Sequence, residues 1–352
     1  MQLNRSYSVR GFIPLLGFLV CWLPLAACSR DEASGQTAVV VPEKLEMRST
    51  TAKVWRPVAE LHTGDHVTVL SRTEDNGANW VKLRGPGGQT GWVEARHLVS
   101  QETVDRSHHL ADEIHNIQAQ AVGRSKATLK LRLTPDRSSD DNVIISLPSG
   151  TQLEIVARER HPRPAAPEAK APTPTPAATR AKDSEDQGTK YDEWYKVRVK
   201  DNTLLPAGWI YAGSVELEVP GEIIHYASSG RKIVGWQKIG TARDENGQAG
   251  DHYLVLERWA LISDDKGDFS RIQVLAFDTK SHEYYSPFRE DVRGRWPVTL
   301  KMEGTRGTFQ IQALDKDGQA HPVDYSVEML EGGKVRVTKI TAKEQARGKR
   351  KK

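Results

Sequence analysis

The sequence has only two cysteines, Cys21 and Cys28, among its 352 residues. So few cysteines exclude the disulfide framework that stabilises many small secreted domains. Cys21 lies inside an apolar N-terminal run, and Cys28 ends that run. If the run is removed and Cys28 is modified, no thiol is left for a catalytic Cys/His pair or a zinc–cysteine site.

Common catalytic and cofactor signatures are also missing. The chain has no Gly-x-Ser-x-Gly elbow, no His-Glu-x-x-His helix and no phosphate-cradling glycine loop. We therefore predict no cofactor, no metal site and no enzymatic activity. A cell-wall enzyme of unknown type, built on Asp251-His252, His282-Glu283 and His321, is the least favoured alternative.

Net positive charge is confined to the two ends of the chain. The formal net charge is +4, but residues 1–27 hold two arginines and no acid, and residues 342–352 hold six Lys or Arg against one Glu. The body between them therefore carries about −3, which offers no broad basic face for nucleic acid. We expect no nucleic-acid partner, and we treat residues 342–352 as a basic tail.

Residues 1–27 have the pattern of a secretory signal peptide. Arg5 and Arg10 precede an apolar run from Phe12 to Ala27, which is short of the ~20 apolar residues that a membrane span needs. The run ends in Leu25-Ala26-Ala27-Cys28, which resembles the lipobox of bacterial lipoproteins. The resemblance implies that Cys28 carries lipid and anchors the mature chain in a membrane.

Two further features refine this expectation. Residues 28–42 are small and polar, which is typical of a tether between lipid and the first domain. Ser29 follows the cysteine where an aspartate would resemble an inner-membrane retention signal. We therefore expect a bacterial cell-envelope protein at the outer membrane.

A series of short strands is predicted over residues 43–100. Trp80-Val81-Lys82-Leu83-Arg84 alternates apolar and basic residues, a glycine-rich turn follows, and Thr90-Gly91-Trp92-Val93 starts the next strand. With the pieces around Met47-Arg48 and Gly64-Asp65, this ordered set resembles the bacterial SH3 family. The resemblance implies a small β-barrel, and Gly91 before Trp92 permits a close approach of two backbones.

The same pattern returns in residues 126–219. Leu129-Lys130-Leu131-Arg132 matches Leu45-Glu46-Met47-Arg48, while Trp194 and Trp209 match Trp80 and Trp92. We therefore predict a second SH3-like domain. It departs from the first by a Pro/Ala-rich insert, residues 157–193, which we predict to be disordered with polyproline II character.

Between the two units, residues 101–125 are predicted to form a linker helix. Leu110, Ile114, Ile117 and Ala121 fall on one helical face, and Gly123 can supply the left-handed stop.

Residues 220–341 are predicted to be an all-β domain of no recognised family. Short turn signals separate consecutive candidate strands, which implies an antiparallel meander closed as a barrel or folded as a sandwich. The candidate strands are Glu222–Tyr226, Lys232–Lys238, His252–Ile262, Arg271–Phe277, Val298–Met302, Thr308–Leu314, Val323–Met329 and Lys334–Ile340. The chain as a whole is thus predicted to be mainly β, with two small barrels joined by a helix and followed by this meander.

Aromatic residues are the best candidates for a binding site. One or two in each SH3-like unit should be core, and the others are predicted to line a groove for glycan or peptide. Basic residues near the strands suit peptide carboxylates, or they are solvated strand faces. The aromatic candidates are Trp55, Trp80, Trp92, Trp194, Tyr195, Trp209 and Tyr211. The basic ones are Arg48, Lys82, Arg84, Lys196 and Arg198.

These features together predict a lipid-anchored envelope protein for binding or scaffolding. Its partners would be the membrane, through Cys28, and either peptidoglycan or an envelope protein, through the paired SH3-like modules. A carrier of small apolar ligands, with the C-terminal β domain closed around a cavity, is the alternative.

Overall fold

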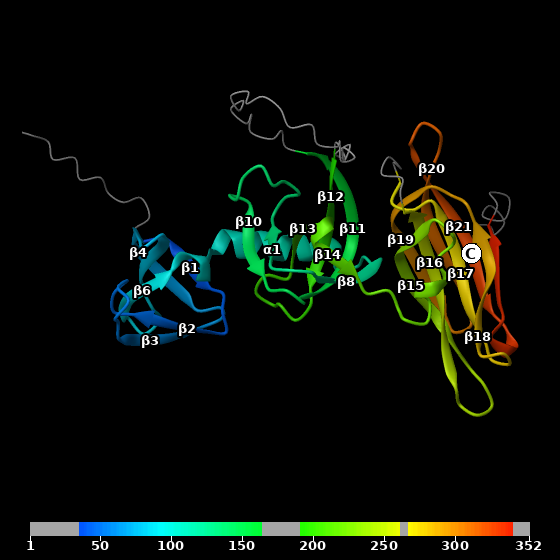
Figure 1. The fold of residues 1–352 in the computed structure, drawn as a ribbon, viewed down its shortest axis with the longest axis horizontal. Helices are drawn as coiled ribbons and strands as arrows, with labels where there is room; N and C mark the ends of the chain where they lie inside the picture. The colour runs from blue at the N-terminus through cyan, green and yellow to red at the C-terminus, as the bar shows by residue number, and fades with distance from the viewer. Residues whose placement is uncertain (1–34, 164–190, 261–266, 341–352) are drawn as a thin grey trace, which may run out of the picture.

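The computed structural model describes residues 35–163, 191–260 and 267–340. The predicted signal peptide, residues 28–34 of the tether with Cys28, the middle of the Pro/Ala-rich insert and the basic tail lie outside these ranges. Within them the fold is mainly antiparallel β, with one α-helix, as predicted. Figure 1 shows three β domains along the long axis of the molecule.

The first domain is a seven-stranded antiparallel sheet with the order β3-β2-β6-β5-β4-β1-β7. Alternate residues point inward, so that Met47, Val81 and Leu83 are fully buried in one apolar cluster. Its strands are β1 (Thr37–Val40), β2 (Lys44–Arg48), β3 (Pro57–His62), β4 (His66–Asp75), β5 (Ala78–Arg84), β6 (Thr90–Glu94) and β7 (Leu98–Ser100), with a 3-10 turn η1 (Ala95–His97).

Residues 28–42 were predicted to be a tether, but strand β1 (Thr37–Val40) lies within them and belongs to the first domain. It pairs with both β4 and β7, and Val39 and Val40 are fully buried. The composition around this strand is small and polar, but the short run Ala38-Val39-Val40 contributes core contacts that a tether would lack.

The second domain repeats the first, strand for strand. Its sheet has the order β10-β9-β13-β12-β11-β8-β14, which is the first order with every strand number raised by seven. Leu129–Arg132 and Leu45–Arg48 therefore occupy the same place in their sheets. The strands are β8 (Ala121–Ser125), β9 (Leu129–Arg132), β10 (Val143–Leu147), β11 (Gln152–Pro162), β12 (Tyr191–Val199), β13 (Ala207–Tyr211) and β14 (Val215–Leu217), with η2 (Ala212–Ser214) before the last.

The predicted disordered insert is shorter than residues 157–193. Strands β11 and β12 pair from Leu153 opposite Val199 to Pro162 opposite Tyr191. Residues 157–162 and 191–193 are therefore strand residues, held by ladder hydrogen bonds and by burial of Arg158 and Asp192. Residues 164–190, on which the rest of that prediction falls, are outside the described ranges.

The linker helix α1 (Gln101–Ile114) is also shorter than predicted. It begins after Ser100, whose Oγ accepts a hydrogen bond from the Thr103 backbone N–H at 3.1 Å, a standard N-cap. Gly123 is not its stop, because it lies in β8. A Cβ there would come within 2.7 Å of Val215 Cγ1 and 2.8 Å of the Glu216 carbonyl oxygen, so the glycine permits the approach of β14.

The third domain consists of two four-stranded meanders. The first contains β15 (Arg231–Arg243), β16 (Ala249–Trp259), β17 (Arg271–Asp278) and β18 (Glu283–Glu290), and the second contains β19 (Gly294–Glu303), β20 (Arg306–Leu314), β21 (Ala320–Met329) and β22 (Val335–Lys339). The segment Glu222–Tyr226, predicted as a strand, instead ends in the 3-10 turn η3 (Ile224–Tyr226). Strand β18 was not predicted, because its half-buried residues do not alternate. A last 3-10 turn, η4 (Glu331–Gly333), precedes β22.

The two meanders share one apolar core, which makes the domain a sandwich. The rings of Phe309 and Tyr325 stack with centroids 4.6 Å apart, and Phe288 meets Tyr325 edge-on at 5.7 Å. These rings occupy the space between the sheets in which the carrier hypothesis places an apolar ligand.

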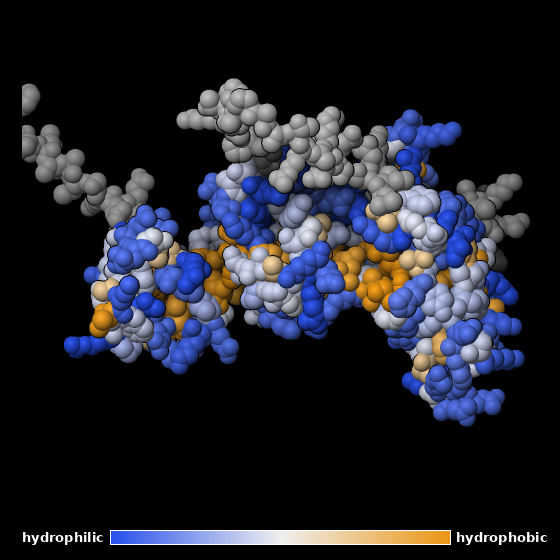
Figure 2. Space-filling view, in the orientation of Figure 1, coloured by the Kyte–Doolittle hydropathy of each residue, from blue (hydrophilic) through white to orange (hydrophobic). Residues whose placement is uncertain are grey.

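The core of the second domain continues into the third. One cluster includes Leu131 and Tyr195 of the second domain together with Trp296 and Phe309 of the third. It also reaches Val99 of the first domain through the helix. Figure 2 shows apolar residues gathered where the first domain meets the second and where the second meets the third. In the part of the chain that the structure describes, no helix combines the length and apolar character that crossing a bilayer requires.

Candidate functional site

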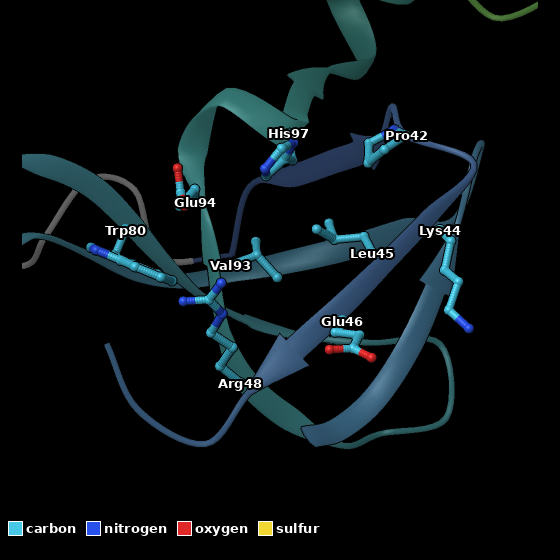
Figure 3. Close-up of a pocket in the computed structure, with 9 residues that line it drawn as sticks. All are labelled: Pro42, Lys44, Leu45, Glu46, Arg48, Trp80, Val93, Glu94 and His97. Carbon is cyan, nitrogen blue, oxygen red and sulfur yellow. The ribbon is translucent and has the colours of Figure 1, made fainter. Parts of the chain in front are cut away.

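A pocket of about 260 Å³ opens on the first domain (Figure 3). Strand β2 forms one wall, and β5, β6 and η1 supply the rest. Its lining mixes an aromatic ring, apolar side chains and charges of both signs. The lining residues are Pro42, Lys44, Leu45, Glu46, Arg48, Trp80, Val93, Glu94 and His97.

Arg48 is the cation at one end of this pocket. It ends β2 opposite Trp92 of β6, and its guanidinium carbon lies 4.5 Å from the ring centre of Trp55 and 5.1 Å from that of Trp80. Two aromatic faces hold the planar group by cation–π attraction. Within residues 35–163 and the other described ranges, no carboxylate lies at ion-pair distance from Arg48.

The other charged side chains are distributed around the pocket rather than paired across it. Lys44 contacts Glu60 of β3 at 2.5 Å, and Glu94 contacts Arg96 at 2.7 Å. Burial, with the nearby cations Arg96 and Arg48, lowers the pKa of His97, so this imidazole is neutral at neutral pH. The pocket can therefore offer a cation at Arg48 and carboxylates elsewhere.

In the second domain, residues of the same domain satisfy the arginine at the position equivalent to Arg48. Arg132, the counterpart of Arg48, is buried and donates to the Ser139 carbonyl at 2.7 Å, to Asn142 Oδ1 at 2.6 Å and to Asp140 Oδ1 at 3.0 Å. Trp194 is 1% exposed and its counterpart Trp80 is 6% exposed, so both rings are buried and the two domains differ in the arginine. The loop between β9 and β10 thus satisfies the cation that the first domain leaves available.

Tyr211 is also enclosed by this loop. Its ring meets Trp194 edge-on at 6.0 Å, and Arg137 lies over its other side at 4.8 Å. Arg137 is fixed in turn by an ion pair with the buried Asp192 at 2.6 Å. These contacts make Tyr211 part of the packing of the second domain.

One cation–aromatic pair recurs in both domains. Lys82 lies opposite Trp92 with its Nζ 6.0 Å from the ring centre, and Lys196 lies opposite Trp209 at 5.6 Å. Lys196 also contacts Glu113 of α1 at 2.6 Å. The pair is therefore part of the β framework that the two domains share. In the second domain, helix α1 covers the lysine of the pair.

The remaining candidates serve structure. Tyr195 stacks on Trp296 of the third domain at 6.1 Å. Arg198 donates to the carbonyls of Ile114 and Ile117 at 2.8 and 2.9 Å, which caps the end of α1. Arg84 is exposed at the end of β5. Of the seven aromatic candidates, the structure brings Trp55 and Trp80 together around Arg48, and Trp194 and Tyr211 together in the packing of the second domain.

The sequence analysis missed Lys44, Glu46, Glu94 and His97 as pocket residues. A signal existed for two of them, because Lys44, Glu46 and Arg48 occupy alternate positions of one strand and must share a face.

The histidines of the third domain do not form a cluster. His252 is buried and its Nδ1 accepts the Phe277 N–H at 3.0 Å, whereas His282 contacts Asp244 at 2.9 Å. His321 lies on β21 opposite Ala313. No group of three metal-ligating side chains occurs among the described residues.

Comparisons with known proteins add little. No family model matches the sequence, and no curated protein matches it. Among solved structures, the chain is similar to NlpC2 from Trichomonas vaginalis at 11% identity and a TM-score of 0.16, with 75% of this chain and 99% of that chain covered. A TM-score this low carries no argument about fold or function.

Proposed function

We propose that the protein is a lipid-anchored envelope protein whose first β domain, of the bacterial SH3 type, binds the peptide part of peptidoglycan. The second β domain, also of that type, then serves as the structural bridge to the third. The proposal is for a binding protein and includes no catalytic step.

The arrangement of Arg48 between Trp55 and Trp80 carries this proposal. A guanidinium held against two rings loses little further freedom when it binds, and it can pair with a carboxylate through two parallel hydrogen bonds. The pocket beside it, about 260 Å³ in volume, holds a group the size of one amino-acid residue.

The mixture of charges favours a peptide that carries both carboxylates and amines. Arg48 suits a carboxylate, and Glu46, which lines the same pocket, suits an ammonium group. Stem peptides of peptidoglycan bear both groups, and their short, extended form fits a groove between strands and a turn. A neutral glycan strand alone would leave these charges without partners.

Co-sedimentation of the mature chain with purified sacculi tests the proposal. Arg48→Gln should weaken binding about tenfold, because a charge-assisted hydrogen bond contributes about 1.5–3 kcal/mol. Trp55→Ala should weaken binding as well, because it removes one of the two rings that hold the guanidinium. Arg72→Gln, on the exposed part of β4, makes the same charge change away from the pocket and should leave binding unchanged.

Failure of the wild-type chain to sediment at low salt would remove peptidoglycan as the ligand. Equal binding of wild type and both pocket variants would remove the pocket as the site. Specific capture of an envelope protein, with no binding to sacculi, would favour the partner-protein hypothesis.

The lipid anchor is tested separately. Cys28→Ala should move the protein from the membrane fraction to the soluble fraction, because the proposed acyl chains supply the membrane affinity. Ser29→Ala is the matched control. An unchanged membrane fraction for Cys28→Ala would contradict anchoring at this residue.

A further inference from the structure

A second cleft, about 540 Å³ in volume, lies between the second and third domains. The strands β11 and β12 supply one side, and Asp268 and β19 supply the other. Its lining holds three arginines, a histidine and one exposed aromatic ring. The lining residues are Arg158, Glu159, Arg160, His161, Tyr191, Asp268 and Arg295.

The acids around this cleft are already engaged. Asp268 accepts from Arg158 Nη1 at 2.9 Å and from the Trp296 backbone N–H at 2.8 Å. Glu159 pairs with His161 at 2.9 Å. Neither carboxylate forms an ion pair with Arg160 or Arg295 among the described residues, although the charge of Asp268 acts on both arginines at longer range.

One carboxylate is shared by three arginines beside the cleft. Glu193 contacts Arg158, Arg258 at 3.1 Å and Arg160 at 3.5 Å. A single carboxylate does not neutralise three arginines. Burial and the neighbouring Arg158 accordingly lower the pKa of Arg160. Burial and Arg258 likewise lower the pKa of Lys232.

The cationic wall is rigid and partly desolvated. Arg158 is only 8% exposed, and its Nε is buried with no hydrogen-bond partner in the described part of the chain. Such a wall costs little to organise when an anion enters, and low local dielectric strengthens each charge-assisted bond. Arg295 is exposed on β19 and lines the cleft, and it makes no ion pair among the described residues.

Tyr191 supplies a different chemistry at the same cleft. Its side chain is 48% exposed, and an open aromatic face beside hydrogen-bonding groups suits the ring of a sugar. The volume exceeds what a bare phosphate ion needs and lies in the usual range for small-molecule sites.

We infer that this cleft binds a phosphorylated sugar, with Arg160 and Arg295 on the phosphate and Tyr191 against the sugar ring. The site is independent of the pocket on the first domain. A sugar phosphate could come from a free metabolite or from a phosphorylated envelope glycan, and both present the same chemistry.

Isothermal titration of the mature chain with glucose 6-phosphate, inorganic phosphate and glucose tests this site. Glucose 6-phosphate should bind more tightly than phosphate, glucose should not bind measurably, and the affinity should fall as salt rises. A phosphorylated glycan fragment then distinguishes the two sources, because tighter binding than glucose 6-phosphate assigns the envelope glycan and weaker binding assigns the free metabolite.

The variant Arg160→Gln/Arg295→Gln should weaken glucose 6-phosphate binding at least about tenfold, while Arg106→Gln on the exposed face of α1 should not. Tyr191→Ala should weaken glucose 6-phosphate binding and leave phosphate binding unchanged. Binding of sacculi should be the same in all these variants, which separates this site from the proposed function.

Three results would overturn the inference. The first is that the wild type does not bind glucose 6-phosphate. The second is that the double variant has a native melting curve and binds glucose 6-phosphate as tightly as the wild type does. The third is that the wild type binds phosphate and glucose 6-phosphate with equal affinity.

Discussion

Gln120 and Val298 are 178 positions apart in the sequence, yet the side chain of one pairs with the backbone of the other through two hydrogen bonds. Gln120 Nε2 donates to the Val298 carbonyl at 3.1 Å, and Gln120 Oε1 accepts the Val298 N–H at 2.7 Å. The backbone of Gln120 also accepts from Trp236 and donates to Ile155, both at 2.8 Å. One buried glutamine thus joins the second domain to both sheets of the third.

Gln120→Leu should therefore destabilise the protein strongly. Gln120 is fully buried, and the change leaves the buried Val298 N–H without a partner, at about 1–3 kcal/mol, while the Val298 carbonyl still accepts from Gln237 Nε2 at 2.9 Å. We expect the free energy of unfolding in urea to fall by about 1–3 kcal/mol. The exposed Gln89→Leu should change it by less than about 0.5 kcal/mol. A Gln120→Leu protein as stable as wild type would contradict the bridging role.

The ionic network beside the second cleft predicts sensitivity to acid. Burial would raise the pKa of Glu193, but Arg158 and Arg258 outweigh it and hold the pKa at about 2 instead of 4.5. Because the pKa is lower in the folded state, the ionised Glu193 stabilises the fold above about pH 4.5, and this contribution is lost as the pH falls from there towards 2. It amounts to at most about 3 kcal/mol.

The measurement is the difference in unfolding free energy between wild type and Glu193→Gln as a function of pH. The difference removes the opposite contribution of Asp268, whose pKa is raised by burial. We expect it to be largest near neutral pH and to shrink below about pH 4.5. A difference that stays constant from pH 7 to 3 would rule out this linkage.

The two counterpart arginines should respond in opposite ways to the same substitution. Arg132→Gln removes the three hydrogen bonds of a buried guanidinium and should cost about 2–3 kcal/mol of stability. Arg48→Gln loses two cation–π contacts and should cost less than about 1–2 kcal/mol, while it abolishes most of the proposed peptide binding. Thermal melting of the two variants, compared side by side, checks this. Equal destabilisation would mean that Arg48 is as structural as Arg132.

The glycines before the two repeated tryptophans should be equally intolerant of a side chain. A Cβ on Gly91 would lie 2.8 Å from the Arg48 carbonyl oxygen, and one on Gly208 would lie 2.9 Å from the Arg132 carbonyl oxygen. Since backbone cannot move aside cheaply, each Gly→Ala variant should lose about 1–3 kcal/mol. Gly221→Ala, where nothing lies within 4 Å, is the control. Little change in urea midpoint for Gly91→Ala would contradict the close approach.

Local patterns predicted most of the β framework. The alternation around Trp80 and the glycine before Trp92 depend on neighbours along one strand and its hairpin partner, so the sequence shows them. The predicted close approach of two backbones at Gly91 is confirmed. The same reasoning found seven of the eight strands of the third domain. It missed β18, whose side chains are half-buried on both faces.

The site was only partly predictable from the sequence, because matching residues of the two repeated domains have different neighbours in the structure. Arg48 and Arg132 match in sequence, but only the loop after β9 supplies Ser139, Asp140 and Asn142 to satisfy the second one. Tyr195 and Gln120 owe their roles to the third domain, and nothing in their own segments indicates which domain they will contact.

The position of strand β1 limits how far the proposed binding pocket can operate from its anchor. Because β1 begins at Thr37, only nine Cα–Cα steps separate it from Cys28, and a fully extended chain spans about 30 Å over that distance. With lipid on Cys28, the first domain would work within one small-domain diameter of the bilayer surface. Ligand capture would then be confined to a thin layer next to the membrane, whatever the thickness of the compartment beyond it.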